Sequence, residues 1–235
     1  MPLPRSTYGH LLWTIAALAL LLAWDATGLD LLLARPWGDS QGFALQHDWF
    51  LSGVLHDDAR RAAWIPALWL VIGVWKPTGV LRRLSSAQRL QWTASTLLAL
   101  AAISMLKHFS HTSCPWDLAE FGGHAHLISH WAIGTLDGGP GHCFPAGHAS
   151  AAFAFVSGYF VLHGVSRRQA RAWLAGALAA GFVLGAAQQL RGAHFMSHTL
   201  WTAWLCWTIA WLVALGVRAL RSQSQAEGPA AEAAF

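Results

Sequence analysis

The chain has 235 residues, of which 55% are hydrophobic and only 11% carry a formal charge, with a net charge of +4 at pH 7. A soluble domain usually carries about 25% charged residues, so this composition excludes an ordinary water-soluble enzyme and a disordered chain. The chain also holds 13 histidines, which outnumber its 11 acidic residues.

Stretches that lack Asp, Glu, Lys and Arg predict six membrane-spanning helices. A helix needs about 20 mostly apolar residues to cross a bilayer, and a lysine at its end can snorkel to extend a shorter stretch. The expected spans are residues 8–24, 62–80, 90–106, 145–163, 172–190 and 198–217. We therefore expect an all-α polytopic membrane protein with one six-span domain over residues 1–221. The Ala/Gln/Glu-rich tail, residues 222–235, is expected to be disordered and cytoplasmic.

The basic residues between these spans indicate the orientation of the chain. Residues 81–89 and 164–171 are short and rich in arginine, which is typical of cytoplasmic loops. We expect both termini in the cytoplasm of a bacterial inner membrane, with segments 25–61 and 107–143 in the periplasm. The net positive charge then reports topology, and a nucleic-acid partner is not expected.

Most of the histidines collect on the expected outer face, where three short stretches stand out at helix ends. These stretches are residues 107–116, 143–150 and 191–198. Each brings a cation or an imidazole, and residues 145–148 open a helix whose free N–H groups favour an anion. Cations neutralise phosphate oxygens, one imidazole can attack phosphorus, and a second can protonate the leaving oxygen. The pattern predicts a phosphoryl-transfer site at the outer face.

The three stretches resemble the motifs of the type 2 phosphatidic acid phosphatases, relatives of bacterial acid phosphatases and vanadium haloperoxidases. Those motifs are Lys, six residues, Arg-Pro; then Pro-Ser-Gly-His; then Ser-Arg, five residues, His, three residues, Asp. The resemblance covers about residues 60–217. It implies an enzyme that removes or transfers a phosphate of a lipid phosphate or diphosphate through a phosphohistidine, without metal or cofactor.

The family roles carry over to four positions of this chain. Lys107 matches the phosphate-binding lysine of the first motif, and Gly147 is the glycine of the second. His148 matches the general acid that protonates the leaving group. His194 matches the nucleophile of the third motif.

Four other positions depart from the family pattern. Cys114 stands where the first motif has arginine, and Ala146 replaces the serine of the second motif. Gln188 occupies the place of a phosphate-binding arginine. His198 occupies the place of the aspartate that orients the nucleophile.

Some compensation for these departures is available within the third stretch. Arg191, three residues before His194, could reach the phosphate together with Gln188. His198 could accept the Nδ1–H of His194, although it would stabilise an imidazolium less than a carboxylate does. We therefore expect either a slower, specialised catalyst or a catalytically degenerate protein that only binds lipid phosphates.

The cysteines lead to a further expectation. Cys114 and Cys143 both lie on the expected outer side, in an oxidising compartment, and we predict a disulfide between them, with two free thiols as the alternative. Cys206 lies within the last expected span and is expected to be a buried apolar residue.

Two questions stay open at this level. The remaining outer histidines are either plain loop residues or a Zn²⁺ or Cu²⁺ site, and a His-ligated haem or metal redox protein is the alternative function. The sequence does not choose among undecaprenyl diphosphate, phosphatidate, phosphatidylglycerophosphate and lipid A as substrate, and it does not indicate the oligomeric state.

Overall fold

The computed structural model describes residues 5–132 and 134–232 and is mostly helical, in agreement with the all-α expectation. Its α-helices are α1 (Arg5–Asp25), α2 (Leu29–Ala34), α3 (Ala59–Ala62), α4 (Trp64–Gly73), α5 (Ser86–His108), α6 (Gly147–Phe153), α7 (Ser157–Leu162), α8 (Arg167–Leu190) and α9 (Met196–Glu232). A π-helical segment, η1 (Phe50–Asp58), and 3-10 turns, η2 (Gly79–Arg83), η3 (Pro115–Asp117), η4 (Ala119–Phe121) and η5 (Ala154–Val156), complete the helical elements. Strand β1 (Gly38–Asp39) pairs antiparallel with β2 (Gly42–Phe43).

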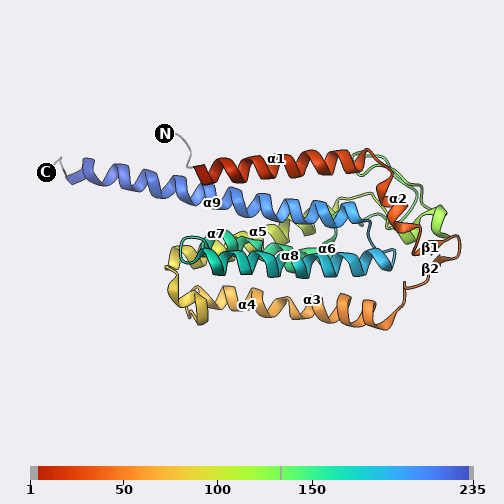
Figure 1. Ribbon diagram of the computed structural model, residues 1–235, viewed down its shortest axis with the longest axis horizontal. Helices are drawn as coiled ribbons and strands as arrows, with labels where there is room; N and C mark the ends of the chain where they lie inside the picture. The colour runs from red at the N-terminus through yellow and green to blue at the C-terminus, as the bar shows by residue number, and fades with distance from the viewer. Residues whose placement is uncertain (1–4, 133, 233–235) are drawn as a thin grey trace.

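The long helices run side by side as an elongated bundle (Figure 1). Helix α9 lies along α1 on one side, α3 and α4 form the opposite side, and α5 to α8 lie between them (Figure 1). The start of α1 and the end of α9 lie at one end of the bundle, while α2 and the β1–β2 hairpin lie at the other (Figure 1). The topology therefore separates a terminal end from a loop-rich end.

The helices that carry the three motif stretches are held together by a shared apolar core. Helices α5, α6 and α9 contribute Ile103, Phe153 and Trp211 to one buried cluster. Burying an apolar side chain of this size stabilises a fold by about 1.5–3 kcal/mol relative to leaving it exposed. At the start of α5, Ser85 and Gln88 form reciprocal hydrogen bonds that satisfy two free N–H groups of the helix end. Packing and capping thus anchor the scaffold of the site.

Three of the described helical stretches are long and apolar enough to cross a membrane. They are Tyr8–Asp25, Arg167–Leu190 and Met196–Ser224, and Gly147–Leu162 is a shorter apolar stretch. Large apolar side chains such as Leu12, Trp13 and Ile65 are more than half exposed on the surface of the bundle. Apolar surface of this extent marks an interaction with lipid or protein, so these features indicate membrane association.

The second expected span, 62–80, differs from the structure at both of its limits. Helical backbone begins at Phe50, continues through Arg60 and Arg61, and ends with α4 at Gly73. The predicted start at residue 62 follows the last charged residues before the apolar stretch. Exposed arginines are nevertheless good helix formers and do not interrupt backbone hydrogen bonding, so the helical backbone begins earlier. At the other limit, Pro77 has no N–H and disfavours helical geometry in Lys76.

The tail of the chain also differs from the expectation of disorder. Helix α9 continues without a break to Glu232, and residues 233–235 lie outside the described part of the chain. Alanine, glutamine and glutamate have high helix propensity, and extending an existing helix avoids the cost of nucleation.

Cys114 and Cys143 are joined by a disulfide that spans 29 residues of sequence. It links the end of the first motif stretch to the start of the second. Cys206 is a buried free cysteine in α9, as its place in the sequence suggested.

We expect removal of this disulfide, by Cys114→Ser with Cys143→Ser, to lower the free energy of unfolding by about 3–4 kcal/mol, because the open chain gains entropy when unfolded. The measurement is thermal unfolding of the purified protein in detergent, with and without a phosphine reductant. The reductant should destabilise the wild type and leave the double variant unchanged. Equal stability of reduced and oxidised wild type, or two free thiols found by non-reducing peptide mapping, would contradict the prediction.

Candidate active site

The structure brings the three motif stretches together at the loop-rich end of the bundle. Lys107 lies in the last turn of α5, and His148 is the second residue of α6. His194 lies in the connection from α8 to α9, and His198 follows it in the first turn of α9. Lys107, His198 and His148 all lie close enough to His194 to act on its protonation, so these groups surround one centre.

The connection that carries His194 is shaped by the end of helix α8. The N–H of Gly192 donates to the carbonyl of Gln189, and the N–H of Ala193 donates to the carbonyl of Gln188, which is the paired bonding of a Schellman motif. Gly192 has a φ of 74°, and a Cβ there would come within 2.3 Å of the Phe43 ring. Glycine is required on both counts. The Gly-Ala-His sequence therefore turns the chain sharply and directs it toward the site.

His194 is buried, with only 3% of its surface exposed. Burial, followed by the charges of Lys107, His198 and His148, holds the pKa of His194 well below its ordinary value. The imidazole is therefore neutral at neutral pH, which is the protonation state of a nucleophile. The ammonium group of Lys107 among these neighbours suits a bound anion.

The contacts of His194 define which of its nitrogens can react. Its Nδ1 lies 3.4 Å from Nδ1 of His198 and 3.4 Å from Sγ of Cys143. Nδ1 is therefore turned toward the protein, and Nε2 is the nitrogen left to attack a substrate. Cys143 belongs to the disulfide, so its sulfur carries no proton to donate. His198 is the side chain whose nitrogen faces Nδ1 of His194, and the backbone of Cys143 is a second hydrogen-bonding partner of His194.

Lys107 lies directly against the start of α6. A Cβ at position 147 would stand 3.3 Å from Cδ of Lys107 and 3.8 Å from its Nζ. Glycine at this position therefore lets the lysine pass close to the backbone just before His148. This contact gives a physical reason for glycine in the second motif.

His148 makes an aromatic contact that the sequence did not suggest. The ring of His56, from η1, lies over the ring of His148 with 3.6 Å between centroids and an angle of 30°. His148 Nε2 is buried and has no hydrogen-bond partner within the described chain, so it is free to engage a ligand. His56 belongs to none of the three motif stretches. In the sequence, only the high histidine content of the chain indicated that such a residue could lie near the site.

Arg191 and Gln188 are close neighbours, but Arg191 is partly committed to the protein. Its Nε donates to the carbonyl of Gln46 at 3.0 Å, and a terminal nitrogen donates to Oε1 of Gln188 at 3.1 Å. Burial lowers the pKa of His56 and the charge of Arg191 acts in the same direction, which places the guanidinium near the His56–His148 pair. Gln188 Nε2 is buried without a partner among the described residues and remains available as a donor. Both residues thus border the site.

Three potential metal ligands lie together in the site. Ligand atoms of Cys143, His194 and His198 are all within 4.8 Å of one another, and no second such group occurs in residues 5–132 and 134–232. Cys143 offers no thiolate while the disulfide is intact, so this group lacks the donor set of a zinc site. Elsewhere at this end of the bundle, His108 and His142 stack as a pair with 5.9 Å between centroids.

The family model for the PAP2 superfamily matches residues 90–222, which is more than half of the chain. The chain belongs to the PAP2 superfamily. PAP2 membership indicates phosphatase-type activity on phosphate esters. No curated protein and no solved structure shows significant similarity to the chain.

The PAP2 match contains all three motif stretches but begins after α4. Helix α1, the hairpin and the segment with His56 therefore lie outside it. Phe43 and His56, which contact the motif residues, come from this unmatched part of the chain.

Proposed function

We propose that this PAP2 protein is a membrane lipid phosphatase that removes, or transfers, the phosphate of a lipid phosphate or diphosphate. The observation that carries the proposal is the neutral, buried imidazole of His194 with Lys107 and His148 around it. A neutral imidazole can attack phosphorus, and neighbouring cations favour a phosphate there.

The proposed reaction has two steps. In the first, His148 carries a proton that the bound phosphate anion stabilises. Nε2 of His194 forms a bond to phosphorus while the bond to the lipid oxygen breaks, and His148 gives that oxygen this proton. In the second, His148 takes a proton from water, the resulting hydroxide attacks phosphorus, and the bond to His194 breaks. Lys107, Gln188 and the unbonded nitrogens of Arg191 hold the phosphate oxygens. A lipid hydroxyl in place of water would give transfer instead of hydrolysis.

A lipid substrate is supported by a cavity that begins beside Gly147. The cavity measures about 380 Å³ and lies between α3–α4 and α5–α6. Arg60 and Arg61 line it, followed by apolar side chains that include Leu100 and Phe155. This arrangement suits an anionic headgroup at the site and an acyl or prenyl chain along the helices. In a six-span arrangement with cytoplasmic termini, the site would face the periplasm of a bacterial inner membrane.

The test is phosphate release from a panel of lipids in detergent or vesicles. The panel contains undecaprenyl diphosphate, phosphatidate, phosphatidylglycerophosphate and lipid A, with His194→Ala as background. We expect release well above background for at least one lipid. No release above the variant across the whole panel would overturn the enzyme proposal.

The same panel tests the alternative of a catalytically degenerate binder. That alternative is favoured by Cys114 and Gln188 at two phosphate-binding arginine positions, and by the bonds of Arg191 to the protein. A binder would retain lipid phosphates in pull-down with vesicles but would release no phosphate from them.

A further inference from the structure

Asp25, at the end of α1, is a buried carboxylate with an unusual set of partners. Only 7% of its side chain is exposed, and its Oδ2 lies 3.1 Å from Nε2 of His130. The indole N–H groups of Trp131 and Trp201 donate to the same oxygen, both at 2.9 Å. Asp25 precedes the PAP2 match and belongs to none of the three motif stretches.

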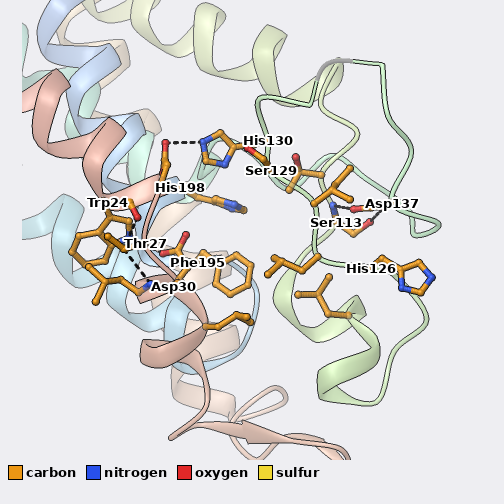
Figure 2. A pocket seen from close by; sticks show the side chains of 18 residues that line it. Trp24, Thr27, Asp30, Ser113, His126, Ser129, His130, Asp137, Phe195 and His198 are labelled. Carbon is orange, nitrogen blue, oxygen red and sulfur yellow. Dashed lines mark hydrogen bonds and ion pairs between the residues drawn. The ribbon is translucent and has the colours of Figure 1, made fainter.

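His130 connects this carboxylate to the catalytic residues. Its ring stacks on Phe144, of the second motif stretch, with 4.1 Å between centroids and an angle of 10°. It also meets the ring of His198 at 87°, with 6.1 Å between centroids. Asp25, His130 and His198 line one cavity of about 230 Å³, in which Figure 2 shows the imidazoles of His130 and His198 close together. This volume holds several water molecules, and the lining is polar enough to bind them.

We propose that Asp25 is the orienting carboxylate of His194, acting as a positioning residue through His130 and His198. The inference rests on the proposed phosphatase function. Asp25 supplies the negative charge that the family aspartate carries and that His198, at the same position, lacks.

The tautomers along this path follow one from another. Asp25 accepts from Nε2–H of His130, which leaves Nδ1 of His130 as an acceptor. The rings of His130 and His198 lie 6.1 Å apart by their centroids, and the proposed link between them is a water that donates to Nδ1 of His130 and accepts from Nε2–H of His198. Nδ1 of His198 would then accept from Nδ1–H of His194, which lies 3.4 Å away. His194 is thereby left with a lone pair on Nε2, the nitrogen that attacks phosphorus.

The electrostatics of His130 support this path. Burial lowers the pKa of His130, while the charge and hydrogen bond of Asp25 act in the opposite direction. The ring is therefore neutral at neutral pH, with the tautomer set by the carboxylate. A neutral ring has one acceptor nitrogen, which the path requires.

The other carboxylates of the cavity are committed elsewhere. Asp30 accepts from the backbone N–H and the hydroxyl of Ser197. Asp137 accepts from the backbone N–H and the hydroxyl of Ser113 in the outer loop. Among the described residues that line the cavity, Asp25 is the carboxylate with a histidine partner.

The geometry at position 198 provides a sharp test. The atom of His198 that faces His194 is Nδ1, which is bonded to Cγ, and an aspartate oxygen at this position would also be bonded to Cγ. His198→Asp therefore places a carboxylate directly against His194 and makes the path through His130 unnecessary.

The experiment compares kcat and KM for four variants on the best lipid of the panel. Asp25→Asn is expected to lower kcat by about 10–100-fold with little change in KM, as loss of a remote orienting partner does. Trp131→Phe removes a hydrogen bond to the same oxygen but keeps the charge, and should stay within about two-fold of the wild type. In the His198→Asp background, adding Asp25→Asn should leave kcat unchanged.

The outcomes separate the inference from the function on which it rests. A wild type that releases no phosphate overturns the proposed function and the inference with it. If the wild type is active and Asp25→Asn has the same kcat as Trp131→Phe, the inference alone is overturned. An equal loss from Asp25→Asn in the wild-type and His198→Asp backgrounds shows a purely structural carboxylate and also overturns it.

Discussion

Replacing His194 by glutamine is expected to reduce phosphate release by about 10⁴–10⁶-fold, as the loss of a catalytic nucleophile does in other enzymes. Glutamine keeps a polar side chain of similar length but cannot form a stable bond to phosphorus. A radiolabelled lipid phosphate, quenched in alkali within the first turnover, should label the wild type and leave His194→Gln unlabelled. The label should be stable in alkali and lost in acid, because a phosphorus–nitrogen bond behaves in this way.

The matched control is His108→Gln. His108 also lies on the loop-rich side, but it stacks on His142, meets Phe109 edge to face, and lies outside the group around His194. Its replacement should leave release and labelling near the wild-type level. Full labelling of His194→Gln would show that another side chain is the nucleophile.

Replacing His148 by glutamine should have an effect that depends on the leaving group. A lipid alkoxide is a strong base and needs a proton as it departs, so loss of the general acid should slow this step by about 10²–10⁴-fold. Nitrophenolate is a weak base and leaves without help. His148→Gln should therefore keep the initial burst of nitrophenolate from nitrophenyl phosphate. Its later turnover should be slow, because His148 also activates water in the second step.

Comparing the two substrates separates catalysis by His148 from binding. If His148→Gln loses the nitrophenolate burst to the same degree as lipid cleavage, His148 acts by holding the phosphate or the fold and does not protonate the leaving group. The ring of His56 over His148 gives a second comparison, since His56→Ala keeps the imidazole of His148 but removes its support.

Much of the scaffold and the identity of the motif residues were predictable from local pattern. Charge-free stretches mark most of the long helices, because apolar residues in lipid or in a core must satisfy their backbone groups within a helix. Motif spacing selected Lys107, His148 and His194, which the structure brings to one centre. The pairing of Cys114 with Cys143 was predicted from the expectation that both lie on the same side of the membrane, and the two are bonded in the structure.

Other features depended on contacts between segments far apart in the chain. Asp25 and His130 are separated by 105 residues, and His56 lies 92 residues before His148, so no local pattern relates them. The successive helical elements η1, α3 and α4, from Phe50 to Gly73, include charged residues that lie outside the charge-free stretch. The bond of Arg191 to Gln46 likewise arises only when the segment between α2 and η1 folds against the end of α8, where Arg191 also bonds Gln188.

The amino-acid sequence by itself determined that this is a helical, membrane-associated PAP2 protein with histidines in place to handle phosphate, because composition and motif spacing are properties of the chain alone. Only the tertiary structure decided which groups surround the positions that depart from the family motifs. Burial sets the charge state of His194, and its partner His198 opens onto a cavity that also holds His130 and Asp25. Such effects depend on distance and exclusion of water, which arise when separate helices pack against one another.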